Sequence, residues 1–284
     1  MVKIATIPNE FSQDFENVLK ILNELDIKYL ELASMWNKSI LDLNQEEENR
    51  VKKIINEYGM KTSAIQTQIM KCYPKDSQYA KIGSKDMHLD LDFNKSRIDR
   101  AIELADKFET QNIVCYSYFS KNGITEKNWQ NLINDYEILI NKCEKRDKIL
   151  VLENEHDTYV ALVDDIYRIM HHFESKHLRH LFDTGNLFKR VNSFTYNDYQ
   201  RIGKYIGYWH VKDVRKMIFG RKVWTVFGTG IIPSKEIFTW YLKDGFDGFF
   251  SAEPHQAGPN RIELCEKHIK NLKDLIESIT SSLN

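Results

Sequence analysis

The feature that most constrains this sequence is a regular alternation of short apolar runs with longer amphipathic stretches. Between the runs, apolar residues recur at the three- and four-residue spacing of helices. Strands that alternate with helices pair in parallel through right-handed crossovers, so the pattern predicts an α/β fold. Eight runs rich in Ile, Val, Leu and Tyr are the predicted strands: residues 2–7, 28–32, 61–67, 112–116, 149–153, 178–183, 205–211 and 248–253.

Local signals at helix ends support this reading. Ser12 and Thr125 are candidate N-caps of the first and fourth helices, and Gly59 suits the C′ position of the second. The rival fold, an open doubly wound sheet, would have a glycine-rich turn after its first strand. Residues 8–11 read Pro-Asn-Glu-Phe instead. We therefore predict a closed (β/α)8 TIM barrel that forms a single domain over residues 1–284.

Two segments are longer than a barrel connection requires. Residues 70–91 follow the third predicted strand, and residues 212–232 follow the seventh. Loops that follow strands lie at the active-site end of a barrel, and long ones there often carry function. We therefore expect both segments beside the site.

Composition argues against several classes of protein. Lys and Arg total 40 against 41 Asp and Glu, a formal net charge of −1, and this balance disfavours a nucleic-acid partner. The sequence contains no apolar stretch of signal-peptide or membrane-spanning length. We expect no membrane association and a cytoplasmic location. The four cysteines form no CxxC pair and are interpreted as reduced thiols.

Ionisable residues stand at the ends of the last four predicted strands, where a parallel strand covered on both faces should be apolar. These residues are Glu153, Asp183, His210 and Glu253. Each of them alone could be a surface residue just beyond its strand. Since the carboxyl ends of barrel strands meet at one rim, all four together indicate one polar site at the mouth.

A divalent metal ion would explain such a set. Carboxylates crowded in a cavity raise one another's pKa unless a cation neutralises them, and one imidazole with several carboxylates is a suitable ligand set. Residues two apart on a strand point the same way, so three of the four ends also bring a second polar side chain toward the site. The pairs are Glu153 with Glu155, His210 with Lys212, and Glu253 with His255.

Five short motifs occur in a fairly specific order and spacing. They are Leu152-Glu153-Asn154-Glu155, Phe182-Asp183-Thr184-Gly185-Asn186, Trp209-His210-Val211-Lys212-Asp213, Gly228-Thr229-Gly230 and Ala252-Glu253-Pro254-His255. Together they resemble the xylose isomerase-like barrel superfamily, in particular its sugar phosphate isomerase/epimerase branch. That branch includes ketose 3-epimerases, inosose dehydratases and hydroxypyruvate isomerases, and the resemblance covers nearly the whole chain.

The resemblance implies that Glu153, Asp183, His210 and Glu253 bind one divalent ion (Mn, Mg, Co or Zn). It also implies that Glu153 and Glu253 act as acid and base on a small sugar, a sugar phosphate or a related ketone. The ion would polarise a substrate carbonyl, acidify the adjacent C–H and stabilise an enediolate. Returning the proton from the opposite face gives an epimerase, and returning it to the neighbouring carbon gives an isomerase. Loss of a β-hydroxyl gives a dehydratase.

Further residues are candidates for substrate binding. Many relatives have a histidine three residues after the aspartate of strand six, whereas this chain has Asn186, which can hydrogen-bond a hydroxyl. Lys212 and Glu155 could contact substrate or form an internal ion pair. His255 could bind a hydroxyl or cap the following loop, and Arg215 could meet a phosphate or remain solvated.

Three other features have more than one interpretation. Glu31, between Leu30 and Leu32, should point inward, toward the substrate or a barrel lysine. Gly228-Thr229-Gly230 could cradle a phosphate with backbone N–H groups or form a tight turn. We expect no metal at the histidines of the opposite barrel end, which are His171, His172, His177 and His180.

The sequence thus predicts a metal-dependent isomerase or epimerase acting through an enediolate. An inosose-type dehydratase on the same site and a non-catalytic carbohydrate-binding barrel are the alternatives. The three-zinc DNA-repair enzymes of the superfamily need further histidines, where this chain has Gln66, Gln68, Tyr116 and Asn186. A homo-oligomer is compatible with the sequence.

Overall fold

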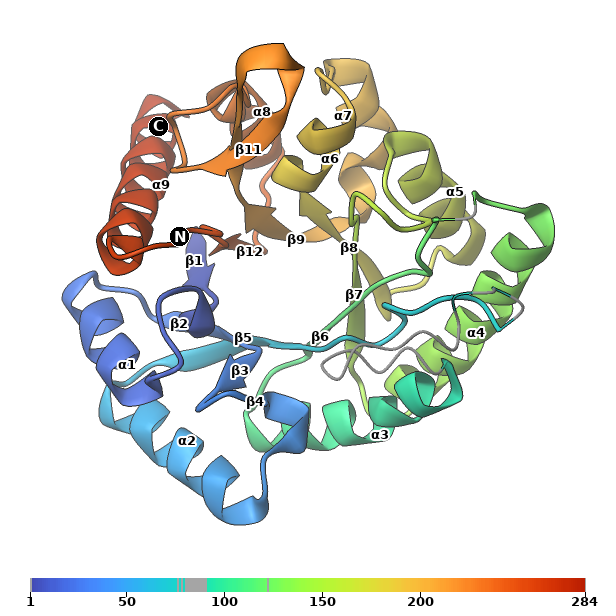
Figure 1. Ribbon diagram of the computed structural model, residues 1–284, viewed down its shortest axis with the longest axis horizontal. Coiled ribbons are helices and arrows are strands. Elements are labelled where there is room, and N and C mark those ends of the chain that lie inside the picture. Colours follow the sequence, from blue (N-terminus) through green and yellow to red (C-terminus); the bar gives the residue numbers. More distant parts are fainter. Residues whose placement is uncertain (1, 76, 78, 80–90, 122, 284) are drawn as a thin grey trace.

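Eight parallel strands close into a barrel, and helices surround it (Figure 1). The computed structural model describes residues 2–75, 77, 79, 91–121 and 123–283. Around the barrel the strand order is β1-β12-β9-β8-β7-β6-β5-β2, which confirms the predicted (β/α)8 TIM barrel. The barrel strands are β1 (Lys3–Thr6), β2 (Tyr29–Leu32), β5 (Lys61–Gln66), β6 (Asn112–Cys115), β7 (Ile149–Glu153), β8 (Leu178–Asp183), β9 (Ile206–Val211) and β12 (Phe249–Ala252).

The outer layer follows the predicted alternation of strands and helices, and the described residues add one unexpected helix. The α-helices are α1 (Phe15–Glu24), α2 (Gln45–Glu57), α3 (Leu91–Lys107), α4 (Glu126–Glu144), α5 (Val163–Phe173), α6 (Thr184–Arg190), α7 (Tyr196–Ile202), α8 (Ser234–Lys243) and α9 (Arg261–Leu283). The described residues also form the short 3-10 helices η1 (Pro8–Glu10), η2 (Ile40–Asp42), η3 (Gly203–Tyr205) and η4 (Ile218–Gly220). The unexpected helix is α6, which begins directly where β8 ends.

Two of the three predicted caps are confirmed. The Thr125 side chain accepts a backbone N–H of α4, and Gly59 follows α2 with a φ of +60°. The Ser12 cap is wrong, because Asp14 is the N-cap of α1 and accepts the N–H of Asn17 at 3.2 Å. Ser12 instead accepts the N–H of Asp14 itself, since it lies two residues too early to reach the first turn.

Side chains inside the barrel change from apolar to polar along the strands. The apolar layer of the lumen consists of Ala64, Val114, Tyr116, Val151, Leu181 and Tyr208. Two residues after three of these positions stand Glu153, Asp183 and His210. Since every second strand residue faces the same side, the same register that fills the lumen also delivers polar groups to its carboxyl end.

The long segment 212–232 contains an antiparallel hairpin of β10 (Asp213–Lys216) and β11 (Lys222–Thr225). A smaller ribbon of β3 (Ser34–Met35) and β4 (Lys38–Ser39) follows β2. Both follow barrel strands and so lie at the carboxyl end. Of the expected segment 70–91, residues 76, 78 and 80–90 lie outside the described residues.

No helix in the described part of the chain combines the length and the apolar character needed to cross a membrane.

His268 joins the last helix to the barrel and is fully buried. Its Nε2 lies 2.9 Å from the carbonyl oxygen of Val211, and its Nδ1 accepts the N–H of Phe227 at 3.2 Å. A carbonyl can only accept and a backbone N–H can only donate, so these contacts require the neutral ring with hydrogen on Nε2. Burial accordingly lowers the pKa of His268 to about 4.

We expect this histidine to make the protein less stable in mild acid. The unfolded chain takes up a proton near the ordinary histidine value of 6.5, whereas the folded chain does not until about 4. The stabilisation is therefore complete above pH 6.5 and is lost as the pH falls toward 4. Between pH 7 and pH 5 this amounts to about 2 kcal/mol of unfolding free energy.

Urea unfolding at several pH values measures this effect. In His268→Gln, whose amide can donate to Val211 but cannot titrate, the free energy of unfolding should depend less on pH by that amount. The exposed His172 provides the matched control, because His172→Gln should leave the pH dependence unchanged. Equal pH dependence in wild type and His268→Gln would contradict the assignment.

Candidate metal centre

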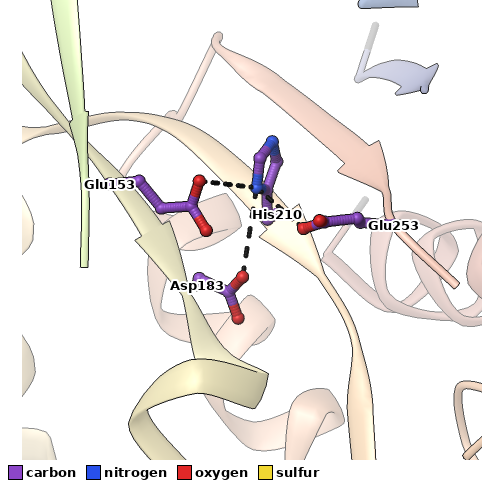
Figure 2. Close-up of side chains that lie close together, drawn as sticks. All are labelled: Glu153, Asp183, His210 and Glu253. Carbon is purple, nitrogen blue, oxygen red and sulfur yellow. Dashed lines mark ion pairs between the residues drawn. The ribbon is translucent and has the colours of Figure 1, made fainter. Parts of the chain in front are cut away.

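Four ionisable side chains from four consecutive barrel strands converge at the carboxyl end of the lumen (Figure 2). Glu153 is the last residue of β7, Asp183 ends β8, His210 lies near the end of β9, and Glu253 directly follows β12. All four are buried. One potential ligand atom from each lies within 4.8 Å of the others, which is the spacing of donors around a single ion.

The distances in this cluster centre on Nδ1 of His210. It lies 2.9 Å from Oε2 of Glu253, 3.4 Å from Oε2 of Glu153 and 3.9 Å from Oδ2 of Asp183. Figure 2 shows the three carboxyl groups turned toward this nitrogen.

Three of these atoms are buried and have no hydrogen-bond partner of acceptable geometry: Oε2 of Glu153, Nδ1 of His210 and Oε2 of Glu253. Burying a polar atom without a partner is unfavourable. Here three such atoms face a common point, and a divalent cation would satisfy all of them. The donor set of one imidazole and three carboxylates fits such an ion.

Neighbouring groups hold the remaining oxygens of these acids. Asp183 is the N-cap of α6 and accepts the backbone N–H of Asn186 at 2.8 Å. The amide nitrogen of Asn186 donates to Oε1 of Glu153 at 2.9 Å and to Oδ2 of Asp183 at 3.0 Å. The structure thus places Asn186, expected beside the substrate, in contact with two of the clustered carboxylates.

Lys212 is the nearest cation to the cluster. Its buried ammonium lies 2.7 Å from both Oδ2 of Asp183 and Oε2 of Glu253. Burial lowers the pKa of Lys212, but these carboxylates outweigh it and raise that pKa well above its ordinary value. The structure therefore shows the internal ion pair of Lys212 with Asp183, and a substrate contact by Lys212 stays a prediction.

Negative charge is concentrated in this site. Burial raises the pKa of Asp183 to about 7, and the neighbouring carboxylates of Glu153 and Glu253 add to the effect against the opposing charge of Lys212. Burial also disfavours the charged ring of His210, yet the surrounding carboxylates raise its pKa well above the usual range. A bound cation would offset this concentration of negative charge.

Of the other expected substrate-binding residues, His255 and Glu155 line the same cavity as Glu153 and Glu253. His255 contacts Oε1 of Glu253 at 3.1 Å and Oε2 of Glu10 at 3.4 Å. Glu155 is paired with Lys71 at 2.8 Å, a lysine that the sequence did not single out. Arg215 is exposed on β10.

Two of the clustered carboxylates, Glu153 and Glu253, open into a cavity of about 570 Å³. Its wall carries many amide and hydroxyl side chains, among them Asn9, Gln13, Ser34, Asn37, Gln66 and Gln68. Both the volume and the polar lining suit a small polyhydroxylated molecule.

The structure gives Glu31 a partner that neither interpretation of the sequence included. Its carboxyl oxygens lie 2.9 and 3.1 Å from Nε2 of His210, opposite the nitrogen that faces the cluster. The only sequence signal was a glutamate within the apolar strand β2, which indicates an inward direction but does not identify the partner.

Gly228-Thr229-Gly230 forms a tight turn around a carboxylate of the chain itself. The N–H groups of Gly228 and Gly230 donate to Oδ2 of Asp213 at 3.1 and 2.9 Å. These donors are therefore engaged, which favours the turn over the phosphate cradle. The close approach also explains Gly230, since a Cβ there would lie 2.1 Å from Asp213.

The histidines at the other end of the barrel have separate surroundings. His177 lies against the carbonyl of Lys148, and His180 against Asn154. None of the metal-type groups found among the described residues includes His171, His172, His177 or His180.

Fold and site together define the class: a (β/α)8 barrel with one histidine and three carboxylates at the carboxyl ends of its strands. Residues 19–275 match the family model described as xylose isomerase-like TIM barrel. The chain belongs to this family, as the motifs in the sequence indicated.

Individual relatives agree with this placement. An inosose dehydratase from Geobacillus thermodenitrificans is 28% identical over 153 residues, which are 49% of this chain and 51% of that protein. The chain thus matches about half the length of this curated relative.

Two solved structures share the fold at low identity. A xylose isomerase-like TIM barrel protein from Mycobacterium smegmatis, in complex with magnesium, has a TM-score of 0.76 at 16% identity and covers 100% of this chain and 98% of its own. The 3-keto-D-glucoside 4-epimerase from E. coli has a TM-score of 0.74 at 13% identity, with 96% and 100% covered.

Proposed function

We propose that this protein is a divalent-metal-dependent isomerase or epimerase of a small sugar, a sugar phosphate or a related ketone. The observation that carries the proposal is the convergence of three buried ligand atoms that form no hydrogen bond, one each from Glu153, His210 and Glu253. The magnesium complex of one structural relative and the epimerase name of another support it.

The residues that would hold the ion are Glu153, Asp183, His210 and Glu253. A bound divalent ion would polarise a substrate carbonyl and so lower the pKa of the neighbouring C–H group. The chain's own part is to bind the substrate's hydroxyl groups along the amide-rich wall and to exclude water from the buried acids.

Proton transfer is assigned to Glu153 and Glu253, which come from β7 and from the end of β12 and reach the same cavity. One carboxylate removes the proton next to the carbonyl, and the other returns it. Lys212 contacts Glu253, and its positive charge favours the ionised form of that acid.

Solvent-deuterium exchange tests this proposal. The protein with added Mn²⁺ is incubated in D₂O with ketoses, ketose phosphates and inososes, and the recovered compounds are analysed by mass spectrometry. We expect deuterium at the carbon next to the carbonyl, in a metal-dependent manner. A metal-loaded protein that binds a ketose in calorimetry without any exchange would contradict catalysis and favour a carbohydrate-binding function.

Dehydration is the second candidate, because the curated relative is an inosose dehydratase. The same acids would then remove a proton next to the carbonyl, and a β-hydroxyl would leave as water. An increase in ultraviolet absorbance from an unsaturated product distinguishes this outcome from isomerisation, which returns a saturated ketone.

A further inference from the structure

Glu31 lies inside the barrel lumen, away from the cavity wall. It is fully buried on β2, and its register with β5 shifts between Leu30 and Glu31. Such an irregularity changes where the next side chain points. Glu31 reaches His210 on β9, although β1 and β12 separate these strands in the barrel order.

The polar groups around Glu31 donate hydrogen bonds to its carboxyl group. Oε2 accepts the hydroxyl of Ser251 at 2.7 Å and the hydroxyl of Tyr208 at 3.0 Å. Ser63 forms a further hydrogen bond to the Tyr208 hydroxyl at 2.8 Å. With its position held from β5, β9 and β12, the carboxyl group presents its oxygens to the Nε2 of His210.

This arrangement determines which nitrogen of His210 faces the cluster. In the neutral ring that can bind a metal ion, the Nε2–H donates to Glu31 and the lone pair lies on Nδ1. Nδ1 is the buried atom without a hydrogen bond, and it lies 2.9 Å from Oε2 of Glu253 and 3.4 Å from Oε2 of Glu153. When a carboxylate accepts the hydrogen of one ring nitrogen, the ring is fixed in orientation and the other nitrogen becomes more basic. Both effects strengthen its binding of a metal ion.

We infer that Glu31 is the positioning residue of the metal centre: it fixes the ring orientation and tautomer of His210 so that Nδ1 is presented to the ion. The inference rests on the proposed function in one respect, namely that the cluster binds a divalent ion. It requires no particular substrate or reaction.

Metal affinity tests the inference independently of catalysis. Co²⁺ binding to the metal-free protein is measured by calorimetry, and the visible absorption of the bound Co²⁺ reports its ligand geometry. Glu31→Gln removes the charge and one acceptor with little change of shape. We expect Co²⁺ affinity to fall by about 10- to 100-fold, the usual effect of removing such a partner, together with an altered Co²⁺ spectrum.

A matched control separates this effect from general damage. Glu48 is another buried glutamate, but it pairs with Arg100 and Lys107 between helices. Glu48→Gln should therefore bind Co²⁺ as the wild type does. If Glu31→Gln does not fold, the double variant Tyr208→Phe with Ser251→Ala replaces it, because it leaves Glu31 in place without its two hydroxyl donors.

The possible results separate the two proposals. If the wild type binds neither Co²⁺ nor Mn²⁺, the proposed function fails. If the wild type binds Co²⁺ and Glu31→Gln, or the double variant in its place, binds it with the same affinity and spectrum, the positioning role alone is overturned. Weakened binding with an altered spectrum supports the positioning role even if no ketose is converted.

Discussion

Replacing either Glu153 or Glu253 by glutamine should reduce turnover of a ketose substrate by roughly a thousandfold or more. A positioned acid or base contributes about 10²- to 10⁴-fold, and each residue is also a proposed ligand of the ion. Glutamine has nearly the same shape as glutamate but cannot exchange a proton. Because the substitution keeps the volume of each buried side chain, we expect both variants to fold normally. Steady-state kinetics and circular dichroism measure the two effects.

Glu155→Gln is the matched control for this experiment. Glu155 lies two residues beyond Glu153 and lines the same cavity, but it is paired with Lys71. Its replacement should reduce kcat far less than either of the other two. Substantial activity in both Glu153→Gln and Glu253→Gln would exclude their assignment as acid and base.

Removing His210 should abolish the stabilisation that a divalent ion provides. An ion that binds only the folded state adds about 2.7 kcal/mol at a concentration of 100 times its Kd. For a chain of this size, that corresponds to a rise in Tm of roughly 5 °C. The wild type should show this shift with Mn²⁺, and His210→Ala should not, because Nδ1 is the atom on which the three carboxylates converge.

Elemental mass spectrometry of the purified proteins provides a second measurement. About one tightly held ion per chain in the wild type, and none in His210→Ala, is the expected outcome. His172→Ala, at an exposed position outside the cluster, should retain the ion. The same Mn²⁺-induced shift in wild type and His210→Ala would show that the ion binds elsewhere.

Much of the architecture could be predicted because it depends on local patterns. The eight apolar runs correspond to the eight barrel strands, since strand formation there reflects β-branched and apolar residues between helical stretches. The four residues of the site could also be predicted, because parallel strands bring their carboxyl ends to one rim whatever their exact register.

Local patterns were less reliable at the ends of elements. Ser12 and Asp14 are both good N-caps, and only the actual start of α1 distinguishes them. Helix α6 could not be predicted in this way, because its apolar pattern is short and its N-cap is Asp183, whose side chain also belongs to the site.

The sequence by itself determined the barrel and the identity of the four clustered residues. The strands and their order can be read along the chain without information about contacts between distant residues. Only the tertiary structure decided how these residues are held. Glu31 and His210 are 179 positions apart, and which pairs meet across the lumen depends on strand stagger and on the register shift in β2. A pattern read along the chain cannot contain that information, because it arises when the barrel closes.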